Sequence, residues 1–243
     1  MLRRFCGRFF QAAGPACENA RSGVGIPGGC EAAVHATRRF MATMPDNHVV
    51  VKLDFSNAFN CIQRDVVLQA IADTIHGIYQ FCHLAYQQNS VLNFGQHAIY
   101  SQEGVQQGDP LGPLQFCLAV HPLLSSMTSS LNIGYMNDFT LGGPIQSVAA
   151  DVATIRSKGI TIGLTLNPSK CEVISKTGAI SHPQFESIHQ TTPDSATLLG
   201  APLTNGLVMD KLDNILVGVC DNFKLATQIS FSFHLYAYCL PTQ

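Results

Sequence analysis

The stretch that decides the fold is HVVVKLDF at residues 48–55, which is rich in β-branched and apolar residues and has a carboxylate, Asp54, near its end. β-Branched residues favour strands, and alternation along a strand places Val49, Val51 and Leu53 on one face and Asp54 on the other. A charged group at the end of an apolar strand is costly unless it is paired or bound to a metal ion. We therefore predict a buried strand that presents Asp54 at its end.

A second acid lies on a predicted hairpin further along the chain. Residues 133–141 read IGYMNDFTL, two short arms with Asn137 and Asp138 near the tip. Apolar periodicity and turn residues predict the other elements. We expect helices at 31–41, 64–79 and 147–157, a helix opened by the 106–113 turn and kinked or shortened at Pro122, strands at 91–94, 98–100, 171–175 and 198–200, and a helical segment at 210–227.

The order β-α-β-β-α-β of these elements is the split βαβ arrangement of an α+β fold. In that topology the first strand lies beside the hairpin. Asp54 and Asp138, far apart in the sequence, are therefore expected to converge at neighbouring strand ends. The residues alone also leave open an unrelated magnesium enzyme of the same architecture.

The composition indicates a folded domain. The chain has 243 residues, of which 46% are hydrophobic and 12% are charged, about half the usual charged fraction of roughly 25%. Such a composition excludes intrinsic disorder. The sequence lacks an apolar run of the roughly 20 residues that cross a bilayer, so we expect no integral membrane protein. The length suits one large domain or two small ones.

Basic residues are concentrated at the N-terminus. Residues 1–40 hold six arginines and two glutamates, whereas the rest holds eight basic and fourteen acidic residues. This asymmetry suits a polyanion partner together with a metal centre, or it is scatter in a weakly charged chain. The basic leader at 1–20 is similar to a mitochondrial transit peptide, or it belongs to a longer domain. We expect an intracellular protein, cytoplasmic or nuclear, with a mitochondrial location as the alternative.

The nine cysteines lack the spacing of a metal site. They are widely separated, and no C-x-x-C pair occurs. Structural zinc is therefore unsupported, and free thiols packed as small apolar side chains in a reducing compartment are expected.

Five segments in order carry a resemblance to a known family. They are VKLDFSNAFN (51–60), QGDPLGPLQF (107–116), YMNDFTLGG (135–143), LNPSKCEVI (166–174) and LLGAPLT (198–204). Together they resemble the palm of a non-LTR (LINE-like) retrotransposon reverse transcriptase, and residues 21–40 look like the end of its fingers. The resemblance implies a palm of split βαβ (ferredoxin-like) type with helices on one face and partial fingers. It divides the chain into a leader (1–20), fingers remnant and palm (21–206) and a truncated thumb-like tail (207–243).

The same resemblance implies an RNA-directed DNA polymerase that works with two Mg²⁺ (or Mn²⁺) ions on an RNA template, a DNA primer and dNTP. Asp54, the backbone carbonyl of Phe55, and Asp138 would bind metal. Asn137 occupies the place of the family's metal-bridging aspartate, and its amide brings one neutral oxygen and two N–H donors. We expect a loss of activity by several orders of magnitude; alternatively, Asn137 and Asp138 simply form a good hairpin turn.

Substrate contacts are carried over from the family in the same way. Phe59 would crowd the sugar 2′ position, or it is a core residue. Gln107 and Gly108 would position the template and the incoming nucleotide, whereas we assign Asp109 to helix capping, with Pro110 at the first helical position.

The last two sites lie nearer the C-terminus. Lys170 would neutralise or protonate the pyrophosphate, or it is a solvated turn residue. Leu199 and Gly200 would hold the primer strand, or they pack as an ordinary strand. Two present-day states follow: a reverse transcriptase domain impaired at Asn137, or a catalytically inactive retroelement remnant that keeps the fold or nucleic-acid binding. The sequence favours the remnant.

Overall fold

The computed structural model describes residues 28–204, and along the chain these divide into two compact units between Pro193 and Asp194. The first unit contains α3 (Gly29–Thr43), β1 (His48–Leu53), α4 (Ala58–Cys61), α5 (Arg64–Thr74), α6 (His76–Tyr86), β2 (Ser90–Phe94), β3 (His97–Ser101), α7 (Gly112–Ser125), β4 (Leu131–Tyr135), β5 (Asp138–Pro144), α8 (Ile145–Thr161), β6 (Glu172–Ile174) and β7 (His189–Thr191). Helices of the described residues are all too short or too polar to cross a membrane.

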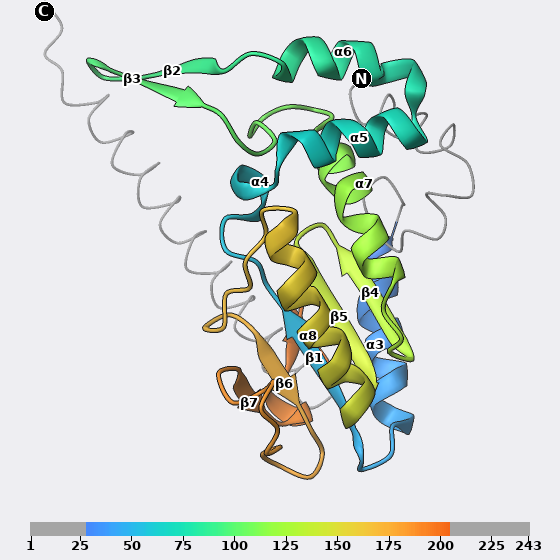
Figure 1. The fold of residues 1–243 in the computed structure, drawn as a ribbon. Coiled ribbons are helices and arrows are strands. Elements are labelled where there is room, and N and C mark those ends of the chain that lie inside the picture. The colour runs from blue at the N-terminus through green and yellow to red at the C-terminus, as the bar shows by residue number, and fades with distance from the viewer. Residues whose placement is uncertain (1–27, 205–243) are drawn as a thin grey trace, which may run out of the picture. The chain divides into compact units, whose positions relative to one another are not determined.

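A five-stranded sheet in the order β4-β5-β1-β6-β7 forms the centre of the first unit (Figure 1). Strand β1 runs antiparallel to both β5 and β6, and β6 and β7 are parallel. Val51 pairs with Leu141 on one side and with Val173 on the other, which fixes the register across the three central strands. The fold is therefore a mixed α/β arrangement in which the first predicted strand lies beside the predicted hairpin.

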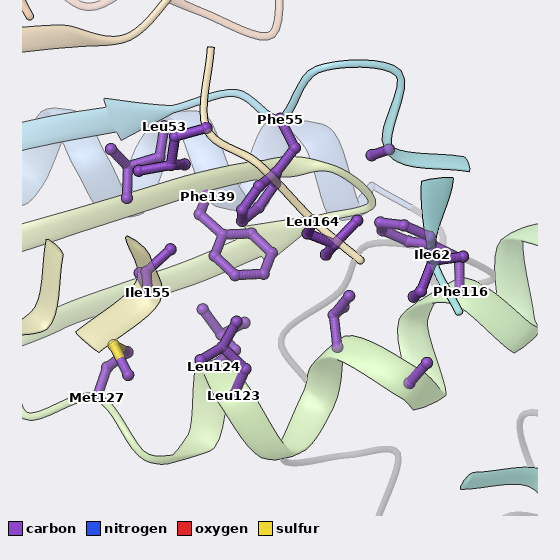
Figure 2. Packing of buried hydrophobic residues seen from close by; sticks show 14 of the residues in the cluster. Leu53, Phe55, Ile62, Phe116, Leu123, Leu124, Met127, Phe139, Ile155 and Leu164 are labelled. Atoms are coloured by element: carbon purple, nitrogen blue, oxygen red, sulfur yellow. The ribbon is translucent and has the colours of Figure 1, made fainter. Parts of the chain in front are cut away.

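Helices α7 and α8 cover one face of this sheet. Side chains that alternate along β1 and β5 point into a single apolar cluster with both helices, and this cluster includes Leu53, Phe139, Leu124 and Ile155 (Figure 2). Burial of this apolar surface stabilises the layer at roughly 25 cal/mol per Å². The predicted inward face of the 48–55 strand is confirmed, because Val49, Val51 and Leu53 all belong to the cluster.

The expectation that helices cover only one face is wrong, because α3 covers part of the other. Gly142 pairs with Val50 and with Leu131, so these residues share the second face. A Cβ atom at Gly142 would lie 2.8 Å from Cε1 of Phe40 in α3, and α3 and β4 are in contact. Since Val50 is fully buried, the part of this face around Val50, Gly142 and Leu131 is apolar as well and needs a cover of its own.

Several predicted bounds change. The helix expected at 64–79 is two helices, α5 and α6, separated at Ile75 (φ −133°, ψ 62°), where β-branched Thr74 and Ile75 give weak helix propensity. Helix α7 begins at Gly112 and continues three residues beyond Pro122, so this proline lies in the last turn. The other predicted helices and strands of the first unit are present with shifted ends.

Two glycines fit places that other residues do not. Gly163 closes the turn after α8 with φ +86°, and a Cβ there would overlap the carbonyl oxygen of Cys61. Gly104 has φ +72° and faces the backbone of Phe59 and Asn60 in the same close way. Both glycines therefore fix where loop segments pass each other.

The second unit, as far as it is described, holds a short hairpin of β8 (Thr197–Leu198) and β9 (Ala201–Pro202), and a 3-10 turn at Pro193–Ser195 spans the boundary. Leu199 (φ 48°) and Gly200 (φ 80°) form the turn between the strands, so the strand expected at 198–200 ends at Leu198. The predicted leader (1–20), the thumb-like tail (207–243) and the helix expected at 210–227 lie outside the described residues.

Candidate active site

The structure brings the two predicted carboxylates to neighbouring strand ends. Leu53 pairs with Phe139 in the antiparallel β1–β5 ladder, so Asp54, which follows Leu53, and Asp138, which precedes Phe139, lie at the same end of the sheet. The pKa of the Asp138 carboxyl is raised, first by burial and next by the negative charge of Asp54. The two carboxylates therefore interact, and their predicted convergence is confirmed.

An aromatic pair lies directly beside the carboxylates. The rings of Phe55 and Phe139 meet edge to face, with centroids 5.2 Å apart and an interplanar angle of 87°, and Figure 2 shows them facing each other in the core. Each ring belongs to the residue that follows one of the two acids. Because the Phe55 ring is buried, this residue can offer only its backbone carbonyl to a ligand at the site.

The turn from Asn167 to Cys171 holds the backbone of Asp54. The amide of Asn167 donates to the Asp54 carbonyl oxygen at 2.9 Å, and the Asp54 amide donates to the sulfur of Cys171 at 3.4 Å. Burial raises the pKa of the Cys171 thiol, so the thiol stays neutral beside the carboxylate. Sequence reasoning did not assign these two supporting roles, although both residues lie in the 166–174 motif.

Two lysines offset part of the negative charge of the site. Lys52 and Lys170 both lower the pKa of Asp138, against the larger effects of burial and Asp54. Lys52 also forms an ion pair with Glu172 at 2.8 Å, whereas Lys170 is exposed on the turn that holds Asp54. The positive charge of Lys170 therefore reaches the carboxyl of Asp138.

Asn137 lies in the two-residue turn that connects β4 and β5. Tyr135 pairs with Asp138 across this turn, and the positive φ of the turn, 54°, belongs to Met136 and not to Asn137. Asparagine is favoured in turns because its side chain hydrogen-bonds to nearby backbone and because it tolerates positive φ. The turn therefore does not use the tolerance of asparagine for positive φ at position 137.

The donor set has the chemistry of a site for a hard cation, although it is small. In the part of the chain that the structure describes, no group of three or more His, Cys, Asp or Glu side chains is arranged so that it could hold a metal ion. Burial raises the pKa of Asp138 most, and the negative charge of Asp54 raises it further. A divalent cation would relieve this repulsion between the two carboxylates. Magnesium is commonly held by one or two carboxylates with water and phosphate oxygens, so Asp54 and Asp138 fit it.

Phe59 packs on the core beneath the loop that precedes α7. Its ring stacks on Phe116 with centroids 4.4 Å apart and an interplanar angle of 19°, and its carbonyl oxygen accepts a hydrogen bond from the amide of Val105 at 2.7 Å. The ring is only partly buried, so core packing and contact with a sugar are compatible.

Gln107 and Gly108 are both exposed on that loop. Gly108 has φ +92° with no atom within 4 Å of its Cβ position, so its backbone is open to a ligand. Asp109 is not the helix N-cap that the sequence predicts, because α7 begins three residues later and carries Pro113, not Pro110, in its first turn. Asp109 instead accepts hydrogen bonds from the Leu111 amide at 2.8 Å and from the Tyr86 hydroxyl at 2.7 Å.

Comparisons with known proteins agree with this geometry. The model of the family described as "Reverse transcriptase (RNA-dependent DNA polymerase)" matches residues 12–203. The chain is 26% identical over 165 residues to the retrotransposable element SLACS 132 kDa protein of Trypanosoma brucei gambiense, covering 63% of this chain and 14% of that protein. It is 29% identical over 150 residues to the retrovirus-related Pol polyprotein from type-1 retrotransposable element R2 of Popillia japonica, covering 52% of this chain and 24% of that protein.

Among solved structures, the fold is similar to that of apo telomerase from Candida tropicalis truncated from the C-terminal domain. The TM-score is 0.51 at 14% identity, with 70% of this chain and 37% of that chain covered. This likeness concerns the fold alone. The chain spans less than a quarter of the length of the two retrotransposon proteins.

Proposed function

Because this chain belongs to the reverse transcriptase family, and its domain is of the retroelement type, we propose that it is the palm of an RNA-directed DNA polymerase with part of the fingers. The observation that carries this proposal is the placement of Asp54 and Asp138 at adjoining strand ends, with a raised Asp138 pKa. The sheet order β4-β5-β1-β6 supports a split βαβ palm. The division into a leader (1–20), fingers and palm (21–206) and a thumb-like tail (207–243) is part of the proposal.

Asp54, Asp138 and the backbone carbonyl of Phe55 would hold magnesium or manganese. Bound divalent ions lower the pKa of an attacking hydroxyl and stabilise charge on a leaving pyrophosphate. The chain's own contribution is to fix the carboxylates: the turn at Asn167 and Cys171 holds the Asp54 backbone, and the β-ladder fixes Asp138.

The remaining residues would bind the substrates. Gln107 and the open backbone of Gly108 would position the RNA template and the incoming dNTP, and the partly buried Phe59 ring would face the sugar. Lys170 would neutralise the pyrophosphate, which is consistent with its electrostatic effect on Asp138. Leu199 and Gly200 would contact the DNA primer.

Asn137 lowers the catalytic activity that this site can support. Replacing a carboxylate by a neutral amide removes one full charge from a site for two dications. Metal-based stabilisation of a transition state amounts to several kcal/mol, and about 1.4 kcal/mol is a tenfold change in rate. The second candidate, favoured by Asn137, is therefore an inactive remnant that binds nucleic acid without polymerising it.

A primer-extension assay on an RNA template, with Mg²⁺ or Mn²⁺, separates the two. We expect weak or no extension by the native chain and a gain of at least about a hundredfold for Asn137→Asp. Asp54→Ala in the Asn137→Asp background should abolish the gain. Asp73→Ala should not, because it removes an exposed carboxylate that accepts a hydrogen bond from Gln69 on the surface of α5. If neither protein extends a primer, the polymerase proposal fails. Salt-dependent binding of primer–template would then support the remnant.

A further inference from the structure

Arg64, at the start of α5, is a buried cation that donates its hydrogen bonds to neutral groups of one loop. It is 9% exposed, and its guanidinium donates to the carbonyl oxygens of Gly104 (2.9 Å), Ser101 (2.8 Å) and Glu103 (3.1 Å) and to the hydroxyl of Ser101 (2.7 Å). The planar fork of arginine suits several fixed acceptors at once. Arg64 therefore fastens the chain between β3 and the exposed Gln107–Gly108 segment.

Tyr86, at the end of α6, fastens the other side of the same segment. The guanidinium carbon of Arg64 lies 5.1 Å from the centroid of its ring. Its hydroxyl accepts a hydrogen bond from the Gln106 amide at 3.1 Å and donates one to Asp109 at 2.7 Å. One hydroxyl thus bridges the residues on either side of Gln107 and Gly108, and burial, with the bond to Asp109, raises its pKa well above the ordinary value.

Further contacts hold the flanks of the segment. The amides of Gly104 and Val105 donate to the carbonyl oxygens of Ile62 and Phe59, and Asp109 accepts from the Leu111 amide. Gln107 and Gly108 themselves remain exposed. The arrangement is a short presented segment whose two ends are fixed by buried polar groups, as a preorganised binding loop requires.

We propose that Arg64 and Tyr86 are positioning residues, which hold the loop of residues 104–109 so that Gln107 and Gly108 meet the template base and the incoming nucleotide. This inference rests on the proposed function of those two residues. Arg64 and Tyr86 touch no substrate in this scheme; they act through the loop. Their removal should therefore weaken discrimination between nucleotides more than it weakens the grip on nucleic acid, which arises from phosphate contacts elsewhere.

The test uses Tyr86→Phe, which keeps the ring and removes only the bridging hydroxyl, and Arg64→Met, which removes the fork. Tyr79→Phe is the matched control, because Tyr79 lies on the same helix and its ring stacks between His76 and His83. The first measurement is amide hydrogen exchange. We expect exchange at residues 104–109 to accelerate about tenfold in Tyr86→Phe, as the loss of buried hydrogen bonds predicts, with exchange in β1 and α8 unchanged.

The second measurement needs no chemistry at the metal site. A 3′-dideoxy DNA primer on an RNA template is titrated with each protein in Mg²⁺, with the complementary dNTP or a mismatched one. We expect the complementary dNTP to tighten the native complex, and Tyr86→Phe and Arg64→Met to lower the ratio of matched to mismatched response by about fivefold. Binding without nucleotide should change less than about twofold, and Tyr79→Phe should behave as the native chain.

Each result decides one proposal. Unchanged exchange at 104–109 in both variants would overturn the positioning role, and so would faster exchange with an undiminished matched-to-mismatched ratio, because that is a purely structural effect. A native chain that shows no nucleotide response refutes the proposed function instead. In that case the exchange data alone still show whether Arg64 and Tyr86 hold the loop.

Discussion

The coupling free energy between Phe55 and Phe139 reports how strongly the strand ends that carry the two carboxylates are held together. The rings meet edge to face at 5.2 Å, both side chains are at most 2% exposed, and each follows an acid of the site. We predict that Phe55→Leu and Phe139→Leu each lower the free energy of unfolding, and that the double variant loses less than the sum.

The expected size follows from the contact. Each single change shrinks a fully buried ring and leaves a small void, which costs about 1–3 kcal/mol. An edge-to-face aromatic pair adds about 0.5–1.5 kcal/mol beyond its buried area, and this is the coupling energy that the double-mutant cycle should return. Urea denaturation, followed by circular dichroism with a common m-value, supplies the four free energies of unfolding.

A control cycle pairs Phe55→Leu with Phe185→Leu. Phe185 is buried in the same core but makes its ring contact with His182, so its coupling to Phe55 should fall within the additivity error of about 0.3–0.5 kcal/mol. A Phe55–Phe139 coupling no larger than that of the control would refute the reasoning. The ends of β1 and β5 would then not be joined as the structure places them.

Three further predictions concern stability. Gly163→Ala should lower the free energy of unfolding by more than the roughly 1–2 kcal/mol of a left-handed backbone, because the new methyl group also meets the Cys61 carbonyl; a loss below about 1 kcal/mol in urea denaturation would contradict this. Asp151→Ala should cost about 3 kcal/mol or more, since its buried carboxylate accepts hydrogen bonds from the amides and hydroxyls of Thr128 and Ser129, and a thermal melt equal to that of the native chain would rule it out. Burial lowers the pKa of His121 below its ordinary value of 6.5, so the unfolded chain binds the proton more readily than the folded chain. The free energy of unfolding should therefore fall as the pH is lowered from above 6.5 through the folded-state pKa. Urea denaturation at a series of pH values should show that His121→Gln reduces this pH dependence.

The sequence was sufficient for the features that depend on local pattern. Alternation in HVVVKLDF predicts the buried face of β1, and the hairpin around Asn137 follows from its turn residues; both are present. The neighbourhood of Asp54 and Asp138 also follows, because the predicted order of elements implies adjacent strands. These inferences succeed because period and connectivity, rather than side-chain detail, determine them.

Contacts between distant segments could not be predicted in the same way. The sequence gives Asp109 the appearance of a helix cap before Pro110, but its actual partners are Leu111 and Tyr86, and Tyr86 comes from a different helix. The cover that α3 provides over Gly142 is equally a matter of packing. A local motif names an acceptor but does not say which distant donor reaches it.

A substitution at Asn137 can change the charge of the site without changing the contacts that hold the fold. Its neighbour Met136 carries the positive φ of the turn, the strand register is set by Tyr135 and Asp138, and the apolar packing below the site is set by Phe55 and Phe139. None of these depends on the amide of Asn137, so an aspartate there adds charge without removing a structural contact of the fold. It also adds a third carboxylate near two that already repel, which should weaken the metal-free protein while strengthening its response to Mg²⁺ or Mn²⁺. If the native defect is one of charge alone, Asn137→Asp should lower the free energy of unfolding without metal and increase the stabilisation that Mg²⁺ or Mn²⁺ brings.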